Sequence, residues 1–223
     1  SRQRRAHPAR GIHGVMDVMD VSLPAMSSAE ARKTERRDEI LAAALRVFAE
    51  KGYHDAGIAD IAGVLGLGHG TFYRYYKNKH DIAVAVLDHV ILRFAAVGLQ
   101  EDPESSNTLE AYRAQTARIL TGMIELGESD PDLVRFFQMQ GFVVDAARLS
   151  RAMDAFTLFV ARFLTNGRSK GFLRQDLDVG PTSEALVALM FEGARRALGR
   201  TEPAQRRQWV DAGMQLMFDG IVG

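Results

Sequence analysis

The stretch from Ile58 to Lys79 constrains the fold more than any other, because it reads as two short helices joined by a tight glycine turn. Gly66 marks the turn, since glycine enters the left-handed backbone region without steric cost and commonly ends a helix. Leu67 would then fill the angle between the two helices. The positions predicted to face inward recur at helical spacing and are Ile58, Ile61, Leu65, Phe72 and either Tyr75 or Tyr76.

Two short helices joined in this way are the arrangement of a helix-turn-helix motif, whose second helix can lie in the major groove of DNA. The alternative is an ordinary helical hairpin in the core of a bundle. The preceding segment favours the motif. Ser27 or Ser28 can cap a helix there, its apolar stripe runs from Ile40 to Phe48, and Gly52 ends it. Three such helices would form a small DNA-binding domain.

The composition favours helix over strand and excludes chemistry that depends on cysteine. The chain has 223 residues, only 6 prolines and no cysteine, so disulfides and thiol nucleophiles are excluded. Its 6 histidines show no pair at the i, i+4 spacing of a helical metal site, and we predict no metal and no cofactor. No apolar run approaches the ~18–20 residues of a membrane span, so we expect a cytoplasmic protein without membrane contact.

Charge is distributed unevenly along the chain. Residues 1–80 hold 13 Lys and Arg against 9 Asp and Glu, whereas residues 81–223 hold 15 against 19. A basic N-terminal part suits a polyanionic partner such as DNA.

Residues 36–82 resemble the tetracycline-repressor (TetR) family in the order and spacing of their landmark positions. The landmarks are Ile40, Ala44, Phe48, Gly52, Tyr53, Ile61, Ala62, Gly66, Gly70, Tyr73 and Lys79. Three positions depart from the family pattern: Gly57 and Gly68 stand where Thr or Ser is usual, and Tyr76 stands where Phe is usual. Both glycines remove a capping hydroxyl, which costs a few tenths of a kcal/mol and a possible phosphate ligand.

The resemblance implies an all-α protein with an N-terminal three-helix helix-turn-helix DNA-binding domain and a C-terminal helical bundle for ligand binding and dimerisation. We expect a disordered N-terminal extension over residues 1–26, the DNA-binding domain over 27–80, and the effector-binding and dimerisation domain over 81–223. Two recognition helices would be needed for useful specificity, which predicts a dimer on a near-palindromic operator in double-stranded DNA.

The predicted DNA contacts lie mainly on the recognition helix, expected from His69 to about Tyr75. His69 and Thr71 can hydrogen-bond base edges, and Gly70 lets the backbone approach closely. By their match to family positions, Tyr73 and Lys79 are expected to bind phosphates. The complete set is His69, Gly70, Thr71, Tyr73, Tyr75, Lys79 and Arg36.

Further helices are expected from the apolar spacing after His80. Thr108 would cap one helix after a loop over 101–107, and Ser129-Asp130-Pro131 would open another. A long helix is expected from Phe142 to near Asn166-Gly167, followed by a linker over 171–184 with its break at Gly180-Pro181. The last two helices, 182–198 and 203–221, carry small residues on their apolar faces and are expected to form the homodimer interface.

Phe and Met are dense between Met123 and Phe163, as in a helical core, and the resemblance implies that some of them line an effector cavity. The polar candidates there are neutral, so we expect a small, largely apolar effector held by few hydrogen bonds. The predicted ligand-binding set is Met123, Phe137, Gln138, Phe142, Met153, Phe156 and Gln115.

The sequence therefore predicts a ligand-responsive transcriptional repressor that leaves its operator when the effector binds. One alternative is a DNA-binding regulator without a small-molecule effector, controlled by a protein partner, and another is an activator. An enzyme has no support in the residues, because no nucleophile with a paired base and no phosphate-binding loop can be found.

Overall fold

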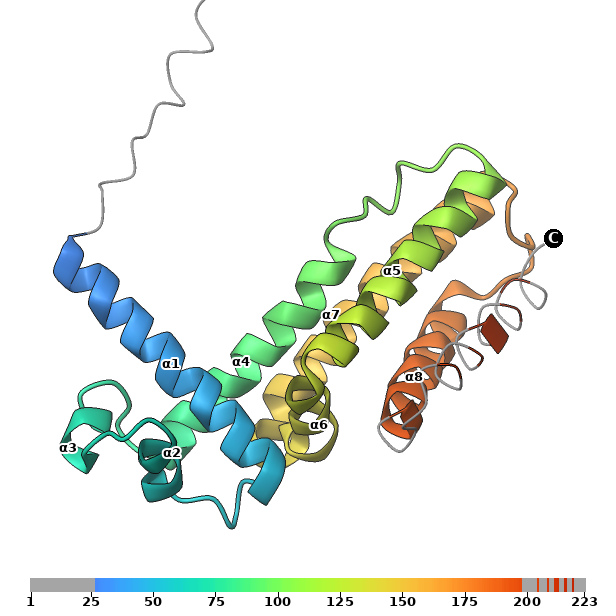
Figure 1. Ribbon diagram of the computed structural model, residues 1–223. Helices are drawn as coiled ribbons and strands as arrows, with labels where there is room; N and C mark the ends of the chain where they lie inside the picture. Colours follow the sequence, from blue (N-terminus) through green and yellow to red (C-terminus); the bar gives the residue numbers. More distant parts are fainter. Residues whose placement is uncertain are drawn as a thin grey trace, which may run out of the picture. The chain divides into compact units, whose positions relative to one another are not determined.

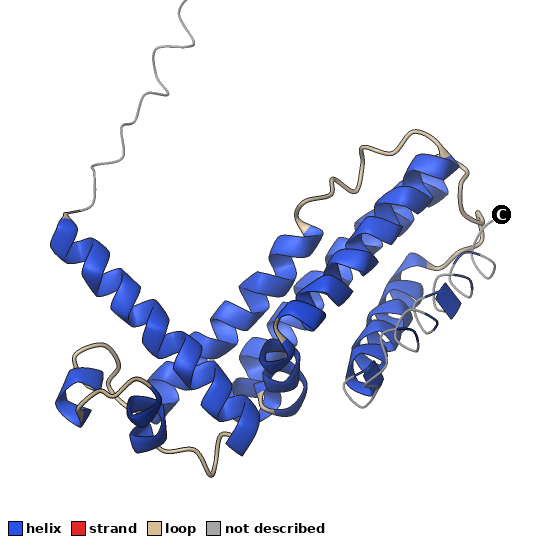
Figure 2. Cartoon of the chain, viewed as in Figure 1, coloured by secondary structure: helices blue, strands red, loops and turns tan. Residues whose placement is uncertain are grey.

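The computed structural model describes residues 27–197 and, beyond them, residues 204, 208, 211, 212, 215 and 218. This part of the chain is built from helices joined by loops, which confirms the all-α prediction (Figure 2). The helices are α1 (Ser28–Lys51), α2 (Ile58–Val64), α3 (His69–Phe72), α4 (Lys79–Gly98), α5 (Leu109–Ser129), α6 (Pro131–Met139), α7 (Gly141–Ser169) and α8 (Val179–Ala197), labelled in Figure 1. The predicted extension over 1–26 and most of the predicted helix 203–221 lie outside the described residues.

Contacts within the chain separate it into two units, residues 1–36 and residues 37–223. In the first unit, the beginning of α1 is fixed by a reciprocal cap. The Ser27 hydroxyl accepts a hydrogen bond from the Glu30 N–H at 3.2 Å, and the Ser27 N–H donates to the Glu30 carboxylate at 2.9 Å. This capping box satisfies two backbone donors at once and confirms Ser27 as the cap.

In the second unit, one hydrophobic core joins the three-helix region to the start of the bundle. Its fully buried members come from α1, α2, α3, α4, α6 and α7, among them Ile40, Phe48, Ile61, Phe72, Ile82, Val86, Leu133, Phe136 and Leu149. α4 contributes to this core along half its length. The core therefore continues across the expected domain boundary near residue 80, which stays a prediction.

A second, smaller core surrounds Tyr112 on α5. It contains Ile119, Phe163, Leu164, Leu173 and Phe218. The Tyr112 hydroxyl donates to the Phe163 carbonyl at 3.2 Å, and burial raises the pKa of Tyr112 to about 12. A buried hydroxyl needs such a partner, so this bond fixes α5 against the later part of α7.

The predicted starts at Thr108 and Asp130 are confirmed, since Thr108 caps α5 and Asp130 caps α6 with Pro131 in the first turn. Asn78, which was not predicted as a cap, caps α4 by accepting from the Asp81 N–H. None of the described helices combines the length and the apolar character that crossing a bilayer requires.

Two predicted helix boundaries in the bundle differ from the structure. The end expected near Asn166-Gly167 lies at Ser169, and Gly167 is instead a position where Leu173 and Tyr112 pack in the space of a side chain. The left-handed glycine is Gly171, with φ +74°. Gly180 and Pro181 do not break the chain either. They lie in the first turn of α8, where a proline loses no helical hydrogen bond.

Candidate nucleic-acid interface

The turn between α2 and α3 has the geometry that its glycine predicted. Gly66 has φ +62°, and the Leu67 N–H donates to the Ala62 carbonyl at 2.9 Å. Ile61 and Ala62 are buried, and Leu65 and Leu67 pack against the main core. The apolar face of α2 and the residue in the turn thus hold α3 at a fixed angle.

Phe72 anchors the short helix α3. It is completely buried, and its ring meets Tyr73 edge-on and Tyr76 at a tilt. α3 ends at Phe72, earlier than predicted, and hydrogen-bonded turns carry the chain on to Tyr76. With Phe72 facing inward, the Tyr73 side chain stays 53% exposed, and the space beside Gly70 is open.

Tyr76 is the tyrosine that faces most fully inward. It is 2% exposed, whereas Tyr75 is partly buried against the same core. Arg37 on α1 donates from Nε to the Tyr76 hydroxyl at 3.3 Å and places its guanidinium carbon 5.2 Å from the ring centre. Burial raises the pKa of Tyr76, and the bond from Arg37 partly offsets this. The additional hydroxyl therefore has a partner within the protein.

The Lys79 side chain is bonded within the protein, and its predicted phosphate contact stays a prediction. Its ammonium donates to the carbonyls of Tyr53, His54 and Ala56 at 2.9, 3.1 and 3.0 Å. These contacts account for all three donors of the ammonium group. A phosphate contact through Nζ would require Lys79 to leave the loop that it holds, so the side chain is better described as a clamp on that loop.

Asp60 supplies the cap that Gly57 cannot. Its carboxylate accepts from the Gly57 N–H at 2.8 Å and from the Lys51 ammonium at 2.7 Å. The bond from Lys51, followed by that from Gly57, lowers the pKa of Asp60. This pair was not predicted from the sequence, although an acidic residue three positions after a cap is a usable signal.

The remaining predicted DNA contacts stay predictions. Thr71 accepts from the Arg74 guanidinium at 3.3 Å, which places a charge beside its hydroxyl. Arg36 is the last residue of the first unit. His69 begins α3, but its side chain is outside the described part of the structure.

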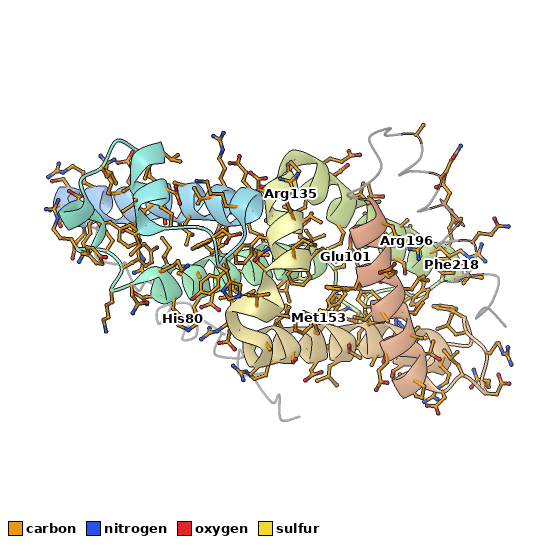
Figure 3. All side chains as sticks on the ribbon, turned by 90° about the horizontal axis from the view of Figure 1, so that it is seen from below. His80, Glu101, Arg135, Met153, Arg196 and Phe218 are labelled. Atoms are coloured by element: carbon orange, nitrogen blue, oxygen red, sulfur yellow. The ribbon has the colours of Figure 1, made fainter. Side chains whose placement is uncertain are left out.

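The predicted ligand-binding residues divide between different parts of the bundle. Phe137 meets Phe94 and Phe191 at ring distances of 4.9 and 5.7 Å, and Gln138 donates to the Phe191 carbonyl at 3.0 Å. Met153, labelled in Figure 3, packs with Phe137 against the main core. These three residues share one region between α6, α7 and α8.

The other four candidates lie elsewhere or point outward. Met123 packs against the smaller core, Phe156 stacks on Phe159, and Phe142 is 51% exposed. Gln115 is buried and bonded to the loop after α4, through Ser106 at 2.7 Å and the Asp102 carbonyl at 2.6 Å. Those bonds use both ends of its amide, so Gln115 holds the loop in place.

A groove of about 400 Å³ lies between α4 and α5 and contains none of the predicted ligand residues. Its walls include Val97, Ile119 and Gly122. At its edge Arg118 and Glu101 pair at 2.8 Å, which lowers the pKa of Glu101. Among the residues that the structure describes, no three His, Asp or Glu side chains gather as a metal site would require.

A helix-turn-helix motif fixed by a buried core, with a half-exposed tyrosine directly after its second helix, is typical of the class of DNA-binding regulators. Residues 40–86 match the family model described as bacterial regulatory proteins, tetR family. The helix-turn-helix region is therefore that of the TetR family, and the comparisons support a TetR-family transcriptional regulator.

Similar proteins extend the match beyond the motif. The fatty acid metabolism regulator protein of Bacillus subtilis is 26% identical over 66% of this chain and 76% of its own length. The transcriptional activator FasR of Mycolicibacterium smegmatis is 23% identical over 85% and 84%, and the repressor LfrR of the same species is 27% identical over 89% and 96%.

Two solved structures share the fold. The fatty acid degradation regulator FadR of Bacillus halodurans superposes with a TM-score of 0.70 at 21% identity, covering 82% of this chain and 94% of its own. FadR of Bacillus subtilis, solved in complex with stearoyl-CoA, gives 0.69 at 22% identity over 82% and 98%.

Proposed function

We propose that this protein is a ligand-responsive transcriptional repressor that binds a palindromic operator as a dimer and leaves it when a small, largely apolar effector binds. The observation that carries the proposal is the continuity of one core through α4. Val86 and Leu87 on α4 are completely buried in the same cluster as Phe72 on α3 and Phe136 on α6. A change in the packing of the bundle therefore alters the packing around Phe72, which anchors the recognition helix.

The required coupling is modest. A tenfold loss of DNA affinity needs about 1.4 kcal/mol of difference in effector affinity between the two states. Helix α4 is held to α7 by a charged contact as well, since Arg148 donates to the Asp88 carboxylate at 2.6 and 2.9 Å. A shift of α4 changes the distance between the two recognition helices of a dimer. The dimer can then no longer bind both half-sites of the operator at once.

The proposed effector class is based on aromatic residues of α4, α6 and α8 that lie next to Gln138. Phe94, Phe137 and Phe191 offer aromatic surface, and the described part of the structure shows no hydrogen-bond partner for the buried amide oxygen of Gln138. Such a site suits a long apolar group with few polar atoms. FadR of Bacillus subtilis was solved with stearoyl-CoA, which makes long-chain acyl compounds the first probes.

The DNA contacts proposed around α3 are His69, Gly70 and Thr71 on the helix and Tyr73 directly after it. Tyr73→Phe removes the hydroxyl but keeps the ring that packs on Phe72. A duplex selected from a random pool by the wild-type protein serves as the operator. We expect Tyr73→Phe to weaken binding by about tenfold, as for loss of one charge-assisted contact. Tyr112→Phe is the control, because it removes a tyrosine hydroxyl in the smaller core, and the folded variant should bind the duplex like the wild type.

The test of effector action adds stearoyl-CoA, and separately stearate, to the protein bound to that duplex. Release of the DNA by either compound supports the repressor proposal. Binding of the acyl compound, seen as a raised melting temperature, without any loss of DNA affinity would contradict it.

The two predicted last helices are proposed as the dimer interface, and sedimentation of the complex should give two chains for each duplex.

An activator is the second candidate, because the relative FasR is named as one. Transcription in a purified system decides between the two. A repressor lowers transcript from a promoter that carries the selected duplex, and an activator raises it.

A further inference from the structure

Gln140 stands at the corner where α6 ends and α7 begins. Its N–H donates to the Phe136 carbonyl at 2.8 Å, and its own carbonyl accepts from the N–H groups of Val143 and Val144 at 3.0 and 2.9 Å. The backbone is therefore fixed by both helices. The side chain does not cap α7 and extends instead toward the loop between α1 and α2.

The Gln140 amide lies directly against the end of α1. Its oxygen accepts from the Tyr53 N–H at 2.9 Å, a contact between residues 87 positions apart in the sequence. Gly52 has φ +81°, and a Cβ at that position would lie 3.6 Å from the amide nitrogen of Gln140. The glycine therefore ends α1 in the left-handed region and presents a bare backbone surface on which the amide packs.

Tyr53 is held from its other side by the first residue of α4. Its carbonyl accepts from the Lys79 ammonium at 2.9 Å, and the same nitrogen lies 4.8 Å from the centre of the Tyr53 ring. A single residue thus bonds to the α6–α7 corner through its N–H and to the start of α4 through its C=O. Both contacts are partly buried, where competition from water is reduced.

Helix α7 is interrupted at Asp145, a few residues after the corner. Asp145 has non-helical backbone angles (φ −156°, ψ 91°), and its carboxylate accepts from the Arg148 N–H at 2.9 Å, as a cap does. Residues 140–145 consequently form a short segment between two breaks. Gly141 in this segment leaves room for Leu87 of α4 and for Leu149, whose nearest methyl groups would lie 3.6 and 2.8 Å from an added Cβ.

We propose that Gln140 is a positioning residue for DNA binding, which couples the α6–α7 corner to the helix-turn-helix motif through the Tyr53 N–H. This inference rests on the proposed function and identifies a route to the DNA-binding helices other than the movement of α4. The loop over 52–57 leads directly into α2, whose first turn begins at Gly57. Displacement of the corner moves the loop and changes the orientation of α2 and α3.

Two substitutions separate the hydrogen bond from the shape of the side chain. Gln140→Met keeps the length but removes the acceptor, and Gln140→Glu keeps an acceptor oxygen. Gln175→Met is the control, because Gln175 is exposed and bonds only locally, to the Arg168 carbonyl at 2.8 Å. We expect Gln140→Met to weaken binding of the selected duplex about fivefold, as for one net hydrogen bond. Gln140→Glu and Gln175→Met should stay within about twofold of the wild type.

Hydrogen exchange supplies the readout that a purely structural role would not change. Coupling is reciprocal, so DNA bound to the wild-type protein should slow exchange in the segment 140–149 as well as at the Tyr53 amide. In Gln140→Met the DNA should no longer affect residues 140–149, although the melting temperature shows a folded protein. In Gln140→Glu the effect should persist.

The outcomes distinguish this inference from the function on which it rests. A wild-type protein that selects no duplex overturns both. A wild-type protein that binds its duplex with no change in exchange at 140–149 overturns the inference alone and requires no variant. A folded Gln140→Met protein with wild-type affinity and wild-type DNA-dependent protection overturns it as well.

Discussion

The ammonium nitrogen of Lys79 lies 2.9 Å from the carbonyl oxygen of Tyr53, so the first residue of α4 fixes the loop that precedes the helix-turn-helix motif. The positive charge is satisfied within the protein by this carbonyl and two others from the same loop. Lys79 thus stabilises the geometry of the motif, and its side chain is not free to serve DNA phosphate in this arrangement.

Replacement of Lys79 by Ala should lower the free energy of unfolding by about 1–3 kcal/mol, because hydrogen bonds from a charged donor are lost. Urea denaturation followed by circular dichroism measures this. Lys77→Ala is the control, since Lys77 is exposed, and it should change stability by less than about 0.5 kcal/mol. A Lys79→Ala protein with unchanged stability but weaker, less salt-dependent DNA binding would instead support the phosphate contact.

Gly167→Ala should destabilise the protein by about 1–3 kcal/mol, although alanine is the better helix former. The added Cβ would lie 2.8 Å from Leu173 and 3.0 Å from the Tyr112 ring, and the bonded tyrosine cannot easily move. Gly63→Ala in α2 is the matched control, because nothing lies within 4 Å of its added Cβ. That variant should gain up to about 1 kcal/mol. Thermal melting compares the two, and equal effects would contradict the packing argument.

His89 should make the folded protein less stable as the pH falls below about 6.5. Burial, and after it the charge of Arg93, lowers the pKa of His89 from its usual 6.5. The unfolded chain then binds a proton more readily than the folded one, so its contribution is present above pH 6.5 and is lost as the pH falls through the folded pKa. His89→Gln should reduce the dependence of stability on pH between 5 and 7. An NMR titration that places the His89 pKa above 6.5 would exclude this.

The Arg148–Asp88 contact between α7 and α4 should contribute less than about 1 kcal/mol to stability, because both side chains are more than one third exposed. A double-mutant cycle with Arg148→Gln and Asp88→Asn isolates the interaction energy. A value well above 1 kcal/mol would show that the pair is effectively shielded from solvent. High salt should weaken the interaction in either case.

Local signals predicted most of the helix starts and the turn of the motif. Thr108 and Asp130 each cap a helix through a side chain that acts within three residues, so their effect is visible in the sequence. Gly52 and Gly66 adopt the left-handed conformation expected of them. Such features depend only on neighbours along the chain.

Features that depend on distant partners could not be predicted. Gly167 is interpreted from sequence as a helix end, but Tyr112, which packs against it, lies 55 positions earlier. Lys79 and Gln140 both bond to the backbone of Tyr53. Every residue type offers the same backbone carbonyl, so such a partner cannot be recognised from the sequence. Gln115 is a candidate ligand residue from the sequence because it is polar in an apolar region, whereas its partners in the structure belong to the loop just before its own helix.

The interruption at Asp145 has a mechanical consequence for α7. A continuous helix of 29 residues is a stiff rod about 43 Å long, which transmits twist from one end to the other. With non-helical angles at Asp145, the helical hydrogen-bond ladder is interrupted, and residues 146–169 form a separate helical segment that starts with its own side-chain cap. The stiffness of one long rod is therefore lost at Asp145, and each segment of α7 is held by its own packing.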